Sequence, residues 1–111
     1  MKDGFTKVAA ATPRLRVADV MFNTAEIIRL YNEAADKNVD VLVFPELALT
    51  GYTASDLFFQ KVLLDEALLG LDKIREATLS SDMLVFVGLP FRWDCKLYNT
   101  AAVLYRGRVL G

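Results

Sequence analysis

The stretch Val41-Leu42-Val43-Phe44-Pro45-Glu46 decides the fold of this chain. Its first four residues are large and apolar with no polar alternation, which is typical of a strand that is covered on both faces. Such strands belong to parallel sheets on which helices pack. Proline lacks the backbone N–H that a strand needs, so Pro45 ends the strand and leaves Glu46 at its carboxyl end.

The residues before this strand predict a second strand and a helix. Residues 5–11 are short and apolar, and we expect a buried strand that Thr12-Pro13 stops. Asn23 is predicted to cap a helix over 24–37, in a capping box with Glu26. Asn38 is a candidate for the left-handed residue that ends this helix.

The residues after it repeat the alternation. Helix-periodic apolar residues predict a helix over about 57–79, and a third buried strand follows at 83–89. Residues 90–96 are interpreted as a polar excursion. Strands at 98–105 and 108–110 are joined at Arg106-Gly107, which predicts a tight hairpin turn. We therefore expect an α/β fold in which strands 5–11, 41–44 and 83–89 share one sheet, the hairpin lies at its side, and both helices cover one face.

Composition excludes several classes of protein. The chain has 111 residues, a formal net charge of -1, one Cys and no His. The arginines are scattered, so we expect no nucleic-acid partner. A single Cys cannot form an internal disulfide, and without His a zinc site is not expected. No stretch approaches the ~20 apolar residues of a membrane span, so a soluble cytoplasmic protein is the expectation.

Glu46 is the leading candidate for chemistry. It follows a buried strand and has Phe44, Leu47, Leu49 and Tyr52 around it in the sequence. Ligands of open α/β sheets bind outside the carboxyl ends of the strands. A carboxylate among apolar residues loses hydration, which raises its pKa toward that of a general base. The alternative is a glutamate on a loop tip that faces water.

The motif FPELALTGY at 44–52 resembles the segment around the glutamate of the nitrilase (carbon–nitrogen hydrolase) superfamily. The resemblance covers nearly the whole chain. Within the superfamily it is greatest to the N-terminal glutaminase domain of glutamine-dependent NAD synthetases. It rests on the segments KVAAATP, SDLFFQ, VGLP, LYNTA and YRGRVLG at 7–13, 55–60, 87–90, 97–101 and 105–111. It implies that residues 1–111 form the N-terminal half of a four-layer α-β-β-α sandwich, and that such domains form homo-oligomers.

The resemblance also implies a Glu–Lys–Cys triad that hydrolyses glutamine. The Cys attacks the side-chain amide, ammonia leaves, and water hydrolyses the resulting thioester to glutamate. The Glu takes the thiol proton and the Lys holds the oxyanion. Only the Glu maps onto this chain, as Glu46, and Tyr52 is the candidate for a substrate-binding wall. The Lys and the Cys are expected beyond residue 111.

The remaining implications concern what the chain lacks. The domain itself would need no cofactor, whereas a separate synthetase domain would receive the ammonia and use ATP and Mg²⁺. We expect the chain alone to be inactive. Its last strand has only just begun at Gly111, which suggests a longer protein. Cys95 does not match the family's nucleophile, and neither Lys61 nor Lys96 matches its lysine.

Three other interpretations stay open at this stage. A stand-alone amidase of the same superfamily would share the motif but lack a synthetase domain. A dinucleotide-binding module would need a glycine-rich turn after the first strand, and Ala11-Thr12-Pro13-Arg14 contains no glycine. A non-catalytic interaction fragment would self-associate through its unpaired strand edges.

Overall fold

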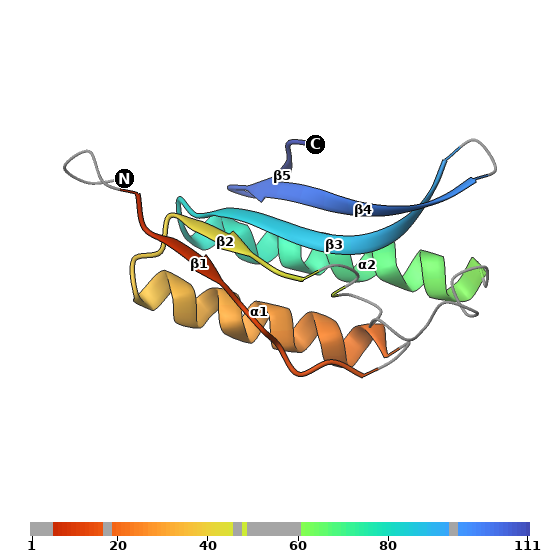
Figure 1. Ribbon diagram of the computed structural model, residues 1–111, viewed down its shortest axis with the longest axis horizontal. Helices are drawn as coiled ribbons and strands as arrows, with labels where there is room; N and C mark the ends of the chain where they lie inside the picture. Colours follow the sequence, from red (N-terminus) through yellow and green to blue (C-terminus); the bar gives the residue numbers. More distant parts are fainter. Residues whose placement is uncertain (1–5, 17–18, 46–47, 49–60, 94–95) are drawn as a thin grey trace.

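The computed structural model describes residues 6–16, 19–45, 48, 61–93 and 96–111, with the backbone alone at 61–63, 92–93 and 96–99. Two helices and five strands make up the described part of the chain (Figure 1). In chain order they are β1 (Val8–Ala10), α1 (Val20–Asp36), β2 (Val41–Val43), α2 (Lys61–Ala77), β3 (Leu84–Trp93), β4 (Lys96–Tyr105) and β5 (Arg108–Val109), with a 3₁₀ turn, η2 (Thr78–Ser80), after α2.

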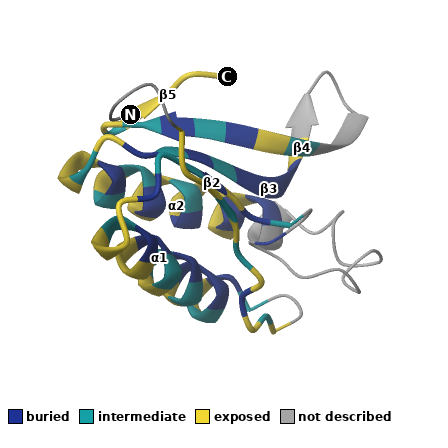
Figure 2. Cartoon of the chain, turned by 60° about the vertical axis from the view of Figure 1, so that its left-hand side comes forward, coloured by how far each residue is buried: buried dark blue, intermediate teal, exposed yellow. Residues whose placement is uncertain are grey.

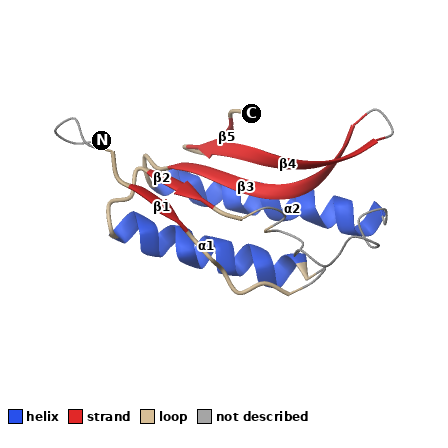
Figure 3. Ribbon diagram, in the orientation of Figure 1, coloured by secondary structure: helices blue, strands red, loops and turns tan. Residues whose placement is uncertain are grey.

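The strands form one sheet in the order β1-β2-β3-β4-β5. β1, β2 and β3 are parallel, whereas β3, β4 and β5 are joined as antiparallel neighbours. Both helices lie on the same side of this sheet (Figure 3). The predicted α/β class, the shared sheet and the single helical layer are therefore confirmed.

The core lies between the sheet and the two helices (Figure 2). Leu42, Val85 and Val87 point into it from the strands and are at most 1% exposed. Tyr31 of α1 and Ile74 of α2 meet them from the helices. Removing such side chains from water is the main stabilising contribution, at about 1.5–3 kcal/mol for each large aliphatic residue.

Among the described residues, β1 and the end of β2 are exposed on the face of the sheet opposite the helices, which corrects one expectation. Val8 is 63% exposed and Val43 is 39% exposed. The strand at 41–44 was expected to be covered on both faces and the strand at 5–11 to be buried, but the helices cover only one face, and β1 also forms an edge of the sheet. The apolar run 41–44 thus correctly predicted a parallel strand. The expectation that this strand would be buried on both faces was wrong for this chain.

The start of α1 differs from the sequence prediction. The helix begins at Val20, and the cap is Asp19, whose side chain accepts a hydrogen bond from the backbone N–H of Phe22 at 3.1 Å. Asn23 lies inside the helix and is fully buried. Glu26 pairs with Arg29 at 2.8 Å, so the predicted capping box of Asn23 and Glu26 is wrong.

The end of α1 confirms the prediction for Asn38, which has φ of 58°. The N–H of Asn38 bonds to the carbonyl of Ala35, and the N–H of Val39 bonds to the carbonyl of Ala34, both at 3.1 Å. These two bonds make a Schellman motif, in which buried Val39 packs back on the helix. The hairpin turn is also confirmed, because Arg106 and Gly107 have φ of 48° and 77°.

β3 continues through the segment that the sequence indicated as a polar excursion. It runs to Trp93 and pairs with β4 along its whole length, including Pro90 opposite Asn99. Phe44 N–H donates to the carbonyl of Phe86 at 2.9 Å, so Phe86 turns its backbone groups toward β2. Pro90 lies on the same side, beyond the last residue of β2, and its missing N–H therefore costs no bond to that strand.

Candidate functional site

A cavity of about 260 Å³ lies at the carboxyl end of β2. It is predominantly apolar, and its lining comes from three strands and from the chain that leaves β2. The described residues that line it are Val43, Phe44, Pro45, Phe86, Gly88, Thr100 and Ala101. This is the sheet edge at which open α/β folds bind their ligands.

The unequal lengths of β2 and β3 create this cavity. Val43, the last residue of β2, pairs with Phe86 of β3. β3 then continues for another seven residues to Trp93, so a ledge of β3 and β4 projects beyond the tip of β2. Gly88 and Ala101 form a pair across this ledge. The floor is therefore the face of the sheet opposite the helices, and Pro45 contributes to the wall.

Glu46 and Tyr52 lie outside the described residues, as does Cys95. The structure places Pro45, the residue directly before Glu46, in the wall of the cavity. Ala48, two residues after Glu46, is fully buried. The roles predicted for Glu46 and Tyr52 stay predictions.

Two lysines weighed in the sequence lie on regular elements. Lys61 is the first residue of α2, and Lys96 is the first residue of β4. Only their backbone is described, so the structure assigns neither of them to the cavity.

A buried asparagine holds the loop that follows β1, and sequence reasoning missed this role. Asn23 Oδ1 accepts from the backbone N–H of Arg16 at 2.7 Å, and its Nδ2 donates to the carbonyl of Arg16 at 2.8 Å. The Arg16 guanidinium lies 4.0 Å from the ring centre of Phe22. Because β1 and β2 are parallel, this loop leaves the sheet at the same edge as the cavity. The signal in the sequence was an amide at an apolar position of the helix.

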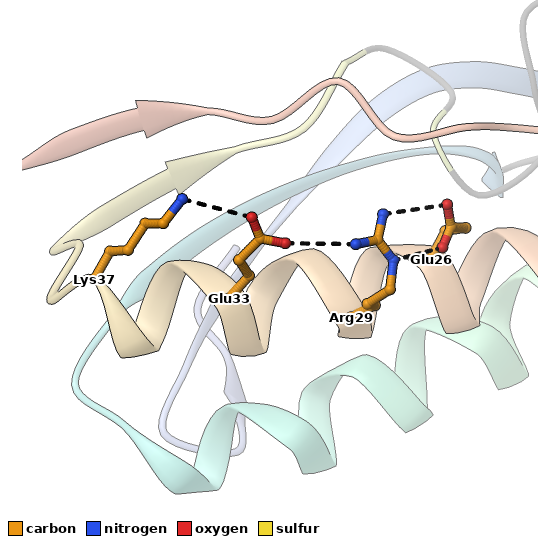
Figure 4. Close-up of polar contacts among 4 residues, drawn as sticks. All are labelled: Glu26, Arg29, Glu33 and Lys37. Atoms are coloured by element: carbon orange, nitrogen blue, oxygen red, sulfur yellow. Dashed lines mark hydrogen bonds and ion pairs between the residues drawn. The ribbon is translucent and has the colours of Figure 1, made fainter.

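A row of alternating charges follows α1 (Figure 4). Arg29 pairs with Glu26 at 2.8 Å and with Glu33 at 3.4 Å, and Glu33 pairs with Lys37 at 3.5 Å. The hydrogen bond from Arg29 lowers the pKa of Glu26 below its ordinary value. The same bond raises the pKa of Arg29. All four residues are paired along the helix, so the row stabilises α1 and offers no free base.

The described residues contain no group of three or more His, Cys, Asp or Glu side chains that could hold a metal ion. Within the same part of the chain, neither helix has the length and apolarity needed to cross a membrane.

Comparison with known proteins gives consistent matches. The sequence profile of the carbon–nitrogen hydrolase family matches residues 7–111. The glutamine-dependent NAD(+) synthetase of Mycobacterium leprae is 38% identical over 97% of this chain, which corresponds to 16% of that protein. The crystal structure of a glutamine-dependent NAD(+) synthetase from Cytophaga hutchinsonii matches 96% of the chain and 18% of its own, with a TM-score of 0.89 and 29% identity. An amidase of the nitrilase superfamily from Nesterenkonia AN1 has the same fold, with a TM-score of 0.80, 21% identity, and coverage of 96% of this chain and 41% of its own. The chain thus spans about one sixth of the length of the synthetases that it matches.

Proposed function

The chain belongs to the carbon–nitrogen hydrolase family, and from this we propose that it forms the first part of the glutaminase domain of a glutamine-dependent NAD(+) synthetase. In the proposed reaction, water cleaves the side-chain amide of glutamine to give glutamate and ammonia. A separate ATP- and Mg²⁺-dependent domain of the same protein would then consume the ammonia. The match to synthetases over 97% of the chain is the observation that carries the proposal.

Glu46 is proposed as the general base. It follows Pro45, which lies in the wall of an apolar cavity at the carboxyl end of β2. An apolar environment disfavours the charged carboxylate, so the pKa of a glutamate there should rise toward the working range of a base. A cysteine thiol near pKa 8.5 needs such a base to become the thiolate that attacks an amide.

The proposed reaction has two stages, which are acylation of the cysteine and hydrolysis of the resulting thioester. The proton of the thiol passes to Glu46, and sulfur bonds to the amide carbon. The C–N bond breaks, and the nitrogen leaves as ammonia with the proton that Glu46 held. Water then attacks the thioester with Glu46 again as the base, which releases glutamate and restores the thiol. Tyr52 is proposed to line the substrate pocket, while the cysteine and the oxyanion-binding lysine would come from sequence beyond residue 111.

Glu46→Gln in the full-length synthetase tests this proposal. We expect NAD formation from glutamine to fall by about 10²–10⁴-fold, which is the usual contribution of a general base. NAD formation from free ammonia should be unchanged, because it bypasses this domain. Glu66→Gln changes an exposed glutamate of α2 and should leave both rates unchanged. Full glutamine-dependent activity in Glu46→Gln would reject the role of Glu46.

A further inference from the structure

The turn between β4 and β5 is held by side chains at the end of α2. Both backbone groups of Gly107 are bonded there: its N–H donates to Thr78 Oγ1 at 2.8 Å, and its carbonyl accepts from Arg75 Nη1 at 2.8 Å. Thr78 is fully buried, and its hydroxyl donates to the carbonyl of Arg75 at 2.6 Å, so its oxygen is free to accept from Gly107. Arg106, the other residue of the turn, pairs with Asp82 at 2.6 Å. Arg75 and Thr78 thus form a clamp on the turn.

This turn sets the register of β5 against β4. Tyr105 pairs with Arg108 directly across its two residues, and the length and type of a hairpin turn fix the pairing that follows. The N–H of Val103 donates to the carbonyl of Gly111 at 2.9 Å, so the pairing extends to that residue. A slip of one residue would move every side chain of the strand to the other face of the sheet. The clamp therefore bears on which side chains β5 presents to each face.

β5 runs toward the edge of the sheet at which the cavity lies. It is antiparallel to β4, and β4 is antiparallel to β3, so β5 has the same direction as β2 and β3. Gly111 bonds to Val103, and Ala101, two residues before Val103 in β4, lines the cavity. Two residues of a strand span about 7 Å. A chain that continues beside β4 after Gly111 therefore reaches the cavity after about two residues.

We propose that Arg75 and Thr78 are positioning residues for the glutaminase reaction. By clamping Gly107, they fix the register in which the strand after Gly111 presents a residue of the proposed triad to the cavity. This inference rests on the function proposed above, in which the lysine and the cysteine lie beyond residue 111. The clamp touches neither the substrate nor the reacting atoms and acts through the backbone of β5. Because a misplacement of about 1 Å can lower a rate about 10²-fold, an anchor at the far end of a strand can control the reaction.

Thr78→Val and Arg75→Met in the full-length synthetase test the clamp by two routes to the same glycine. Thr78→Val removes the acceptor for the N–H of Gly107, and Arg75→Met removes the donor to its carbonyl while keeping an unbranched apolar stem. A displaced triad residue stabilises the transition state less well, which lowers kcat and kcat/KM equally. We expect each variant to lower kcat of glutamine hydrolysis about tenfold or more while the KM of glutamine changes less than about twofold. NAD formation from free ammonia should be unchanged.

Two control variants separate positioning from stability, with all rates measured at a temperature where circular dichroism shows every variant to be folded. Thr78→Ser keeps the acceptor and should retain the parent kcat. Asn38→Val strains the end of α1, leaves the clamp in place, and should also retain it. An unchanged kcat in both clamp variants, or an equal loss in Asn38→Val, would overturn the inference. The proposed function would still stand if Glu46→Gln lowers glutamine-dependent activity as expected, so the two failures are distinguishable.

Discussion

Replacing Asn23 by Ala should loosen the loop between β1 and α1 and destabilise the sheet edge that carries the cavity. Asn23 is 0% exposed, and its amide makes two hydrogen bonds to the backbone of one residue, Arg16. The substitution removes the side-chain acceptor and the side-chain donor together. The backbone N–H and the carbonyl of Arg16 then lose these two partners.

The magnitude follows from these two groups. A buried polar group left without a partner costs about 1–3 kcal/mol. Both bonds are only partly buried, so the lower end applies and the two groups together cost about 2 kcal/mol. Alanine returns about 0.5 kcal/mol through its higher helix propensity. We expect a net loss of about 1.5 kcal/mol in the free energy of unfolding of this domain.

Amide hydrogen exchange in the full-length protein measures the effect locally. Loss of one hydrogen bond worth about 1 kcal/mol should speed exchange of the Arg16 N–H about fivefold. Asn23→Asp keeps an acceptor for this N–H but loses the donor to the carbonyl, so it should preserve the protection of Arg16 while still lowering the melting temperature. Asn32→Ala removes an exposed asparagine of the same helix and should change neither quantity. Unchanged protection of Arg16 in Asn23→Ala would refute the reasoning.

Three further changes have defined expectations. Thr78→Val removes the hydroxyl that accepts the N–H of Gly107 at 2.8 Å, so it should cost about 1–2 kcal/mol by thermal unfolding, whereas Thr78→Ser should cost much less. Asn38→Val places a β-branched residue at φ of 58° and should destabilise by about 1 kcal/mol, while Asn38→Gly should not. Arg29→Met should raise the pKa of Glu26 toward 4.5. Because the folded pKa is lowered, the contribution of Glu26 is present above pH 4.5 and is lost as the pH falls through the folded value. Melting temperatures at pH 7 and pH 3 should therefore differ less in Arg29→Met, and an undiminished difference would contradict this assignment.

Local patterns in the sequence predicted most of the fold because they coincide with tertiary packing. The run 41–44 was apolar enough to indicate a parallel strand, and Asn38 and Gly107 stand where the backbone needs positive φ. Each of these features depends on residues close together in the sequence. The shared sheet and the single helical layer followed from the alternation of strands and helices.

The errors arose where a distant residue decides the outcome. Asn23 has the pattern of a helix cap, but its amide bonds to the backbone of Arg16 in the loop, and Asp19 caps the helix in its place. Pro90 has the pattern of a strand breaker, but the shortness of β2 leaves its missing N–H without consequence. Neither the partner of Asn23 nor the end of β2 relative to β3 can be deduced from local periodicity.

The difference in length between β2 and β3 connects the fold to the candidate site. If β2 continued beside β3 as far as Pro90, its backbone would fill the ledge and Pro90 would break the ladder. The early end of β2 therefore leaves space for the cavity and permits Pro90 within β3. The motif at 44–46 located the carboxyl end of β2, but Gly88 and Ala101, which also line the cavity, come more than forty residues later in the sequence. For this reason the sequence could indicate the carboxyl end of β2 as a candidate site, while the register of β2, β3 and β4 was needed to see which strands line the cavity there.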